Sequence, residues 1–197
     1  MCQFCLDAQI TKPAQNCNVF QFWEACQTPP VFVLVTGLPG SGKSTLAAPL
    51  AESLALPLLA KDTIKEALWD ALGSGDREWS RQLGVAAAVA LESLAQSLPG
   101  AVIDHFVHAD TADRWASLPG VLEVRCACAP ALARARYAGR PRHACHFDAE
   151  LLVDSYEAWI TEDATRPPIG TRLDIDTAAP VDIAKIVRWI RSEWSDA

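Results

Sequence analysis

The sequence predicts an α/β fold in which a parallel β-sheet carries helices on both faces. Five short apolar runs alternate along the chain with longer stretches of helical periodicity. Apolar strands separated by helices are typical of parallel sheets that are buried on both sides. A glycine-rich loop follows the first apolar run and leads directly into a helix-forming stretch. This order is the usual start of a doubly wound fold whose ligands bind beyond the carboxyl ends of the strands.

The apolar runs expected to form strands are residues 31–36, 56–60, 101–104, 121–128 and 172–176. Apolar residues recur at spacings of three and four, which predicts helices over 43–54, 64–71, 78–98, 110–118, 130–138, 147–162 and 181–194. Asp62 or Thr63 is expected to cap the second of these helices. Because residues 85–91 are almost entirely apolar, we expect the third helix to be buried on more than one side.

The composition indicates an ordinary globular protein. A chain of 197 residues is long enough for one domain with a small appendage. The formal net charge of -7 argues against extended nucleic-acid binding, which needs a basic surface. No apolar run approaches the roughly 20 residues of a membrane span, and the N-terminus does not resemble a signal peptide. A cytoplasmic protein without a membrane partner is therefore expected.

Residues 1–30 differ in composition from residues 31–197 and are expected to form a cysteine-rich extension to the main domain. Their cysteines are irregularly spaced and comprise Cys2, Cys5, Cys17 and Cys26. The spacing of the first two resembles half of a zinc site, but no second C-x-x-C pair follows. Free thiols are the favoured interpretation, and zinc binding is the alternative.

The glycine-rich loop matches G-x-x-x-x-G-K-[ST], a pattern that predicts a phosphate-binding loop between a strand and a helix. Glycine permits backbone conformations that bring several N–H groups to one anion, and the next helix directs its positive end toward it. Lys43 can reach the β- and γ-phosphates, and the Ser44 hydroxyl can ligate Mg²⁺. The expected nucleotide-binding residues are Gly37, Pro39, Gly40, Ser41, Gly42, Lys43, Ser44 and Thr45. The alternative is a glycine-rich turn that binds nothing.

Two further polar positions follow strands of the predicted sheet. Asp62 comes after the second strand and Asp104 ends the third, so both converge with Gly37 at one edge. Asp104 suits a carboxylate that holds Mg²⁺, directly or through water, and the alternative is a helix cap. Asp62 could accept a proton from an acceptor hydroxyl. Lys65 lies one turn further and would face the same cleft; otherwise it is a solvated helix lysine.

A basic segment at about 134–147 is expected to form a lid. It carries four arginines within nine residues, namely Arg134, Arg136, Arg140 and Arg142. Such guanidinium groups could close over a transferring phosphoryl group and stabilise its charge. The alternative is a solvated loop whose arginines pair with Asp148 and Glu150. His143 and His146 are expected at the surface of this segment rather than as metal ligands.

These features together resemble a known family. G-L-P-G-S-G-K-S-T after the first strand, K-D-T-I-K-E-A-L after the second, V-I-D-H-F at the third and the arginine-rich segment after the fourth resemble the small P-loop kinases. Within them the chain is most similar to the group of chloramphenicol phosphotransferase, zeta-toxin-type sugar-nucleotide kinases and the 5′-kinase domain of polynucleotide kinases. The resemblance covers residues 31–194.

The resemblance implies a sheet of strand order 2-3-1-4-5, ATP as phosphoryl donor and Mg²⁺ as cofactor. It implies that Asp62 acts as the base toward the acceptor hydroxyl and that Lys65 touches the acceptor. Arg136 and Arg140 would bracket the γ-phosphate, and Asp104 would correspond to the carboxylate after the third strand.

The leading hypothesis is therefore a kinase that phosphorylates a hydroxyl of a small molecule, such as an antibiotic, a sugar or a nucleoside. A polynucleotide 5′-hydroxyl kinase is the second reading; the net charge counts against it, although a short groove could hold one 5′-terminal nucleotide. A nucleotide-dependent switch is the third. Asp62 discriminates the switch from the kinases, because a switch needs no carboxylate facing an acceptor.

Overall fold

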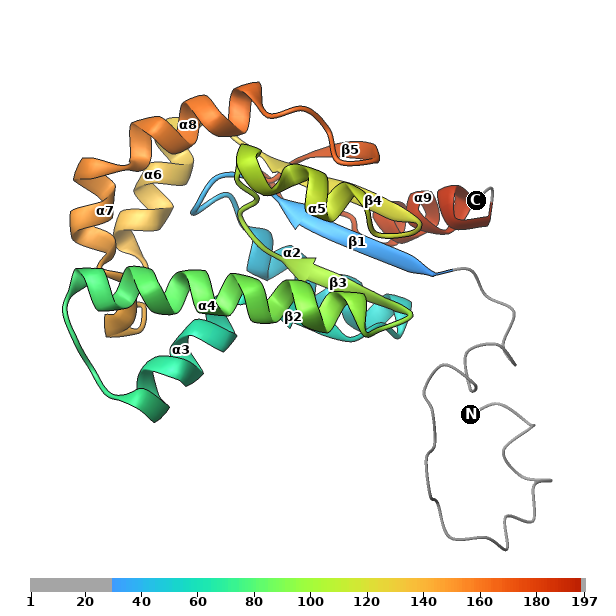
Figure 1. Ribbon diagram of the computed structural model, residues 1–197. Coiled ribbons are helices and arrows are strands. Elements are labelled where there is room, and N and C mark those ends of the chain that lie inside the picture. The colour runs from blue at the N-terminus through green and yellow to red at the C-terminus, as the bar shows by residue number, and fades with distance from the viewer. Residues whose placement is uncertain (1–29, 196–197) are drawn as a thin grey trace, which may run out of the picture.

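The computed structural model describes residues 30–195 of the chain, and a five-stranded sheet forms their centre (Figure 1). The strands are β1 (Val31–Thr36), β2 (Leu58–Ala60), β3 (Gly100–Asp104), β4 (Val121–Ala127) and β5 (Thr171–Asp176). Every pair is parallel, and the order is β2-β3-β1-β4-β5. The predicted fold class and strand order are thus confirmed. All six residues of β1 are buried, which agrees with its place between β3 and β4.

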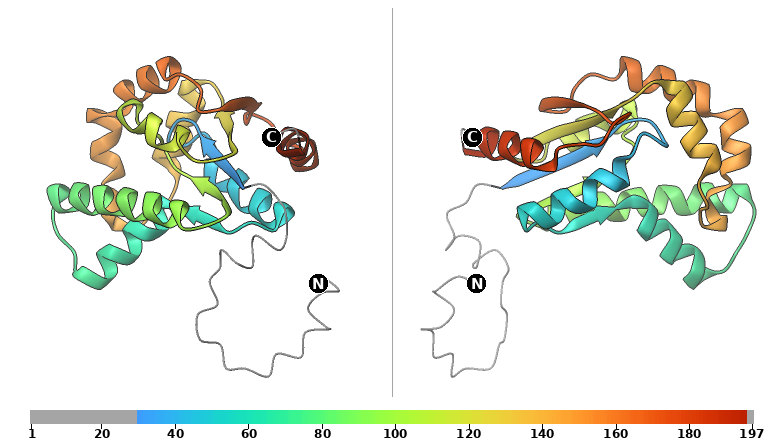
Figure 2. Two further views of the ribbon diagram at one scale, coloured as in Figure 1. Left: turned by 45° about the vertical axis from the view of Figure 1, so that its right-hand side comes forward. Right: turned by 180° about the vertical axis from the view of Figure 1, so that it is seen from behind.

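Helices cover both faces of the sheet. They are α2 (Lys43–Leu54), α3 (Lys61–Leu72), α4 (Arg77–Gln96), α5 (Ala112–Ala116), α6 (Pro130–Gly139), α7 (Asp148–Asp154), α8 (Tyr156–Thr165) and α9 (Ile183–Ser195), with 3-10 turns η2 (Ala109–Thr111) and η3 (Ala144–His146). Val33 of β1 packs in the cluster that contains α2 and α9, whereas Leu34 packs in the cluster that contains α4 and α5. Successive strand residues thereby fill opposite cores. Figure 1 shows α4 and α5 in front of the sheet, and α2 comes forward when the molecule is seen from behind in Figure 2.

The structure corrects two expectations about helix ends. α3 begins at Lys61, so neither Asp62 nor Thr63 caps it; Ala60 holds the cap position and makes no side-chain bond there. The single helix expected over 147–162 is two helices, because the backbone at Ser155 (φ −125°, ψ −18°) leaves the helical conformation between α7 and α8.

The expected burial of α4 on more than one side is also wrong. Only one stripe of the helix is buried, and it includes Leu83, Ala87 and Leu91. Val85 and Val89 lie on another face and are 55% and 54% exposed. The apolar middle of α4 therefore has one side in the core and another side open to the functional cleft.

Several expectations fall on the parts of the chain outside residues 30–195. The four N-terminal cysteines lie there, and so does nearly all of the predicted extension. Cys126, Cys128 and Cys145 belong to the described part and are free thiols. None of the helices within residues 30–195 combines the length and apolar character that crossing a membrane requires.

Candidate active site

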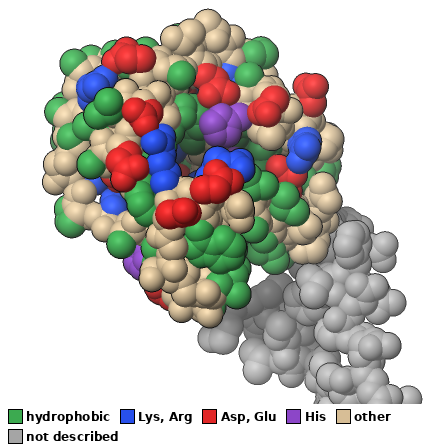
Figure 3. Space-filling view, turned by 60° about the vertical axis from the view of Figure 1, so that its left-hand side comes forward, with side chains coloured by type: hydrophobic (Ala, Val, Ile, Leu, Met, Phe, Trp, Pro, Cys, Tyr) green, Lys and Arg blue, Asp and Glu red, His purple; other side chains and the backbone are tan. Residues whose placement is uncertain are grey.

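One large cleft opens at the carboxyl edge of the sheet, with a volume of about 1810 Å³. The residues predicted from the sequence that line it are Pro39, Gly40, Gly42, Lys43, Ser44, Thr45, Asp62, Lys65, Asp104, Arg136 and Arg140. Figure 3 shows this side of the molecule hollowed, with basic and acidic side chains close together around the hollow. The parallel topology thus brings the ends of β1, β2 and β3 to one cleft, as expected.

The phosphate loop owes its shape to glycines. Gly37, Gly40 and Gly42 have φ angles of 124°, 88° and 99°, in the region that favours glycine. A Cβ at Gly40 would lie 2.2 Å from the Ala133 carbonyl oxygen, so a larger residue would push the loop away from α6. Gly37 and Ser41 do not line the cleft. The Ser41 N–H instead donates to the Leu38 carbonyl at 2.9 Å, and this hydrogen bond closes a turn within the loop.

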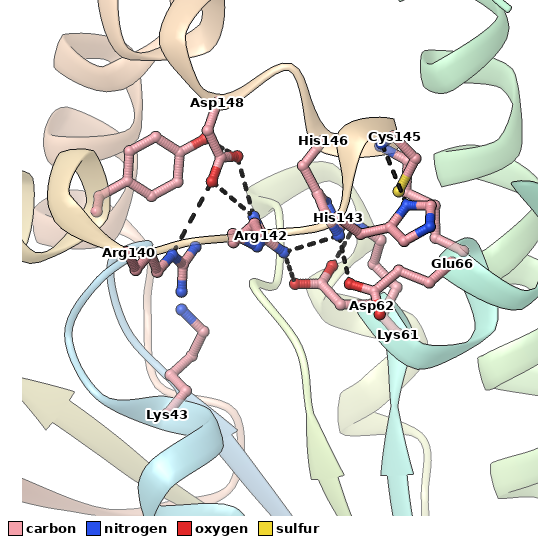
Figure 4. Close-up of polar contacts among 12 residues, drawn as sticks. Lys43, Lys61, Asp62, Glu66, Arg140, Arg142, His143, Cys145, His146 and Asp148 are labelled. Atoms are coloured by element: carbon pink, nitrogen blue, oxygen red, sulfur yellow. Dashed lines mark hydrogen bonds and ion pairs between the residues drawn. The ribbon is translucent and has the colours of Figure 1, made fainter. Parts of the chain in front are cut away.

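Two cations meet above this loop. The Lys43 ammonium donates to the carbonyls of Gly37 at 2.8 Å and Leu38 at 2.9 Å. Figure 4 shows Lys43 and Arg140 pointing toward one another from opposite sides of the cleft. Burial lowers the pKa of both groups, and the positive charge of Arg140 lowers that of Lys43 further. Two desolvated cations facing each other form a place where an anion is strongly stabilised.

The Ser44 hydroxyl and the Asp104 carboxylate lie next to each other in the same cleft and are joined by a hydrogen bond. Burial raises the pKa of Asp104, whereas Lys43 and a hydrogen bond from the Ser44 hydroxyl lower it. A hydroxyl and a carboxylate are ligands that Mg²⁺ accepts when phosphates and water complete its shell. Within residues 30–195 no group of three His, Cys, Asp or Glu side chains gathers as a metal site. The donor set therefore fits a cation that is bound together with a nucleotide.

Asp62 is held by basic residues from two parts of the chain. The Arg142 guanidinium donates to its carboxylate, and the Lys61 ammonium lies 3.3 Å from it (Figure 4). Burial raises the pKa of Asp62, but Lys61, Arg142 and His146 outweigh that effect and hold the pKa well below its ordinary value. The carboxylate is therefore ionised at any physiological pH, and its side chain is still 47% exposed.

Asp148 contacts two of the four arginines of the basic segment 134–147. Its carboxylate accepts from Arg142 at 3.0 Å and from the Tyr137 hydroxyl at 2.7 Å, and it lies 3.9 Å from Arg140. Of the pairings considered for a solvated basic loop, the one with Asp148 is present, whereas Glu150 lies near Arg77 of α4. The arrangement fixes Arg140 toward Lys43 and Arg142 toward Asp62.

His146 is not at the surface, contrary to expectation. It is 4% exposed, and its Nε2 lies 2.7 Å from Glu66 of α3 and 3.1 Å from Arg142. Burial lowers its pKa below the ordinary value. The turn η3 is thereby fastened to α3, which supports the contact between Arg142 and Asp62.

The other two arginines have different surroundings. Arg134 pairs with Glu157 at 2.5 Å, which braces α6 against α8. Arg136 donates to the Thr177 carbonyl at 3.0 Å, where β5 leads to α9. The family resemblance favours Arg136 and Arg140 and does not indicate Arg142, and nothing in the local sequence distinguishes the four arginines of this segment.

The far side of the cleft lies between α3 and α4. Lys65 is buried and donates to the Ser80 hydroxyl at 2.8 Å. Val85 and Val89 of α4 add an exposed apolar wall to the same cleft. Trp159 of α8 also lines it. This half can therefore surround the carbon skeleton of a small molecule while Asp62 meets its polar group.

Comparisons with known proteins identify the family and the fold. A family of sequences described as an AAA domain matches residues 32–153. A crystal structure from Chloroflexus aurantiacus J-10-fl, whose description assigns the protein to the kinases and names no substrate, has a TM-score of 0.70 and 30% identity. That alignment covers 86% of this chain and 98% of the other. No curated protein matches the sequence.

More distant structures share the fold alone. A gluconokinase from Sinorhizobium meliloti 1021 has a TM-score of 0.52 and 17% identity, covering 86% of this chain and 94% of the other. A shikimate kinase from Bacteroides thetaiotaomicron has a TM-score of 0.53 and 16% identity, covering 84% and 95% respectively.

Proposed function

Because this chain belongs to the AAA domain family, among its small P-loop kinases, we propose that it transfers the γ-phosphoryl group of ATP to a hydroxyl of a small molecule. The observation that carries this proposal is the division of the cleft into two charged halves. Lys43 and Arg140 face each other above the phosphate loop, and the Asp62 carboxylate lies beside them, held by Arg142. The first half suits a phosphoryl donor and the second suits an acceptor.

In the donor half, the loop N–H groups and the start of α2 would hold the β- and γ-phosphates. Lys43 and Arg140 would flank the γ-phosphoryl group and stabilise the charge on its oxygens during transfer. Ser44 and Asp104 would hold Mg²⁺, which neutralises phosphate charge when bound. Arg136 remains a predicted contact on the nucleotide side of the cleft.

In the acceptor half, the ionised Asp62 carboxylate would accept a hydrogen bond from the acceptor hydroxyl. As the bond between that oxygen and phosphorus forms and the bond to ADP breaks, the hydroxyl proton passes to Asp62. The depressed pKa of Asp62 makes it a weak base, so its main contribution is to orient the hydroxyl. A loose phosphoryl-transfer transition state needs little deprotonation before transfer.

The acceptor is proposed to be small and to carry hydroxyl groups. Gluconokinase and shikimate kinase, which share this fold, are named for acceptors of that kind. Their sequence identity to this chain is too low to assign it their substrates. The cleft between α3, α4 and the basic segment 134–147 supports a ligand of similar size.

The test is a screen of sugars, sugar acids, nucleosides and hydroxyl-bearing antibiotics with γ-labelled ATP. The full-length protein is expected to move label onto one class of compound. A short oligonucleotide with a 5′-hydroxyl belongs in the same screen. Release of labelled phosphate to water at the same rate with every compound would contradict a kinase and favour a nucleotide switch.

A further inference from the structure

His108 lies in the functional cleft and uses one of its two ring nitrogens. It belongs to the connection between β3 and α5, lines the cleft and has a side chain that is 50% exposed. Its Nδ1 lies 3.0 Å from Oε2 of Glu162 on α8. A carboxylate accepts hydrogen bonds and has none to donate, so Nδ1 carries the ring proton. Within residues 30–195 Nε2 forms no hydrogen bond, and in the neutral ring it is an acceptor.

The ring of His108 is held in place from several sides. Its backbone carbonyl accepts from the Thr111 N–H at 3.1 Å and from the Thr111 hydroxyl at 3.0 Å. The Phe106 ring meets the His108 ring edge to face, with the centroids 5.0 Å apart. Glu162 is fixed as well, because its Oε1 accepts from the Ala109 N–H at 2.8 Å. The direction of the imidazole is therefore set before any ligand binds.

The other histidines of the chain differ from His108. His143 uses both nitrogens, since Nδ1 accepts from the Cys145 N–H at 3.3 Å and Nε2 lies 3.1 Å from Asp70, and it does not line the cleft. His105 and His146 are 7% and 4% exposed. His108 alone among them combines an accessible side chain, a place in the cleft and an unused nitrogen within the described part of the chain.

A purely structural role accounts for Glu162 better than for His108. The bond from the Ala109 N–H already joins α8 to the connection after β3. That role needs no imidazole with a second nitrogen at the wall of the cleft. A histidine whose tautomer is fixed by a carboxylate is a usual arrangement for a ring that binds a ligand through its other nitrogen.

His108 lies in the same part of the cleft as Asp62. Both residues line the cleft, and the charges of both act on the pKa of the buried His105, which His108 lowers and Asp62 raises. Such influence decreases with distance, so His105 lies near both. A compact molecule whose reacting hydroxyl meets Asp62 can therefore contact His108 with another group.

We propose that Nε2 of His108, oriented by Glu162, accepts a hydrogen bond from a second hydroxyl of the acceptor, so that the acceptor is a polyol. This inference rests on the proposed kinase function. An anionic group is disfavoured at this position, because a carboxylate has no hydrogen to donate to Nε2 and would approach the carboxylate of Glu162. His108 is then a specificity-determining residue, and Glu162 is a positioning residue that acts through it.

The test compares polyols with analogues that lack one hydroxyl. D-ribose is paired with 2-deoxy-D-ribose, D-glucose with 2-deoxy-D-glucose and 3-deoxy-D-glucose, and glycerol with 1,2-propanediol. Binding to the full-length protein loaded with ADP and Mg²⁺ is measured by calorimetry, and phosphoryl transfer from ATP is measured separately. At least one polyol is expected to bind about tenfold more tightly than one of its deoxy analogues, because the analogue leaves a hydrogen-bonding group of the site unpaired.

Variants of His108 assign this ratio of affinities to its residue. His108→Phe keeps an aromatic ring next to Phe106 and removes the nitrogen, so the ratio should approach one. His108→Gln places an amide oxygen near the position of Nε2 and should retain part of the ratio. Thermal unfolding of each variant checks that the fold is kept.

Variants of α8 test the orienting role of Glu162. Glu162→Gln should lower the ratio by about threefold, because one amide oxygen cannot accept from both His108 and the Ala109 N–H. Glu157→Gln is the same change at a residue of α8 that is 76% exposed and does not line the cleft, and it should leave the ratio intact. An unchanged ratio in Glu162→Gln would refute the orienting role.

The outcomes separate this inference from the proposed function. Equal binding within every pair, binding of none of the polyols, or an equal loss for both members of a pair in His108→Phe would overturn the hydroxyl subsite, even if other compounds were phosphorylated. Selective binding of a polyol that is lost in His108→Phe would support the subsite even without phosphoryl transfer, and would then contradict the kinase alone.

Discussion

The guanidinium of Arg142 donates directly to the carboxylate of Asp62, which lies 80 residues earlier in the sequence. Asp62 and Arg142, which belongs to the basic segment 134–147, line the same cleft. This segment is therefore attached to the residue that is proposed to orient the acceptor. Asp148 and His146 hold the guanidinium from its other sides, so its contact with Asp62 is part of a network rather than a single surface pair.

Lys43→Met should remove phosphoryl transfer while the protein stays folded. Loss of one pre-positioned donor to a transferring group typically lowers the rate by about 10²–10³-fold. Initial rates with labelled ATP, together with thermal unfolding, measure both effects. Lys185→Met is the matched control, since that lysine is exposed on α9. Wild-type turnover in Lys43→Met would refute the assignment of the phosphate loop.

Asp62→Asn should lower transfer by about 100-fold or more and leave nucleotide affinity within about threefold, because an amide orients a hydroxyl poorly and cannot take its proton. Rates and ADP binding are measured side by side. Asp70→Asn provides the control on the same helix, as Asp70 is 69% exposed and pairs with His143. If Asp62→Asn instead abolished ADP binding, Asp62 would have a structural role.

Arg142→Met should shift the acid limb of the pH–rate profile to higher pH. In the wild type, burial raises the pKa of Asp62 but Lys61 and Arg142 hold it well below its ordinary value, so Asp62 stays ionised throughout the assayed range. Removing one of these charges raises that pKa, and activity should then decline as pH falls toward the ordinary carboxyl range. Arg81→Met, which removes an exposed partner of Glu78, should leave the profile unchanged. An unaltered acid limb in Arg142→Met would contradict this coupling.

His105 should make the protein less stable as pH falls. It is 7% exposed, and its ring packs at a tilt against Trp115 with the ring centroids 5.6 Å apart. Burial lowers the pKa of His105 from 6.5 to about 3, with smaller contributions from Lys61 and His108. The unfolded chain takes up a proton below pH 6.5 while the folded chain does not. The contribution of neutral His105 to the free energy of unfolding is therefore complete above pH 6.5. As pH falls from 6.5 toward 3, the free energy of unfolding decreases by about 1.4 kcal/mol per pH unit.

The variant His105→Phe isolates this effect, because it keeps an aromatic ring and removes the titrating group. Urea unfolding of both proteins at several pH values between 7 and 4 gives the difference in the free energy of unfolding. The free energy of unfolding of the variant, relative to that of the wild type, should increase steadily as pH falls. Parallel curves for the two proteins would show that His105 titrates normally.

Glu123→Ala should destabilise the fold by about 3–5 kcal/mol, the usual cost of breaking a buried ion pair from one side. Glu123 and Arg166 have side-chain exposures of 0% and 2%, and the carboxylate also accepts from the Ile169 N–H at 2.8 Å. Denaturant unfolding measures the loss. Glu78→Ala breaks the exposed pair with Arg81 and should leave the free energy of unfolding almost unchanged, because solvent screens that pair. Similar losses for the two variants would contradict the distinction.

Much of the architecture was accessible from the sequence. The strands β1, β3, β4 and β5 fall within a residue or two of the predicted ranges, because the pattern of apolar residues that favours a strand is local in sequence. The phosphate loop was equally clear, since its spacing of glycines and Lys43 is a local geometric requirement. The strand order followed from the family resemblance and is confirmed.

The misassigned features depend on the environment that each segment meets. Residues 85–91 are apolar enough for full burial, but Val85 and Val89 face a cleft rather than a core. His146 lies in a polar segment that suggests a surface, but Glu66 and Arg142 enclose it. Periodicity records which side chains are apolar and contains no information on what lies opposite them.

The sequence by itself determined that β1 leads into a phosphate loop that contains Lys43 and Ser44, that Asp62 follows the second strand, and that Asp104 ends the third. Only the tertiary structure decided that Arg142 reaches Asp62, that Arg140 faces Lys43, and that Lys65 is buried without a counter-ion among the described residues. The physical reason is the distance in sequence between the residues that determine each feature. Strands, turns and glycine conformations depend on neighbours in sequence, whereas the charge around a carboxylate or an ammonium depends on segments that only folding brings together.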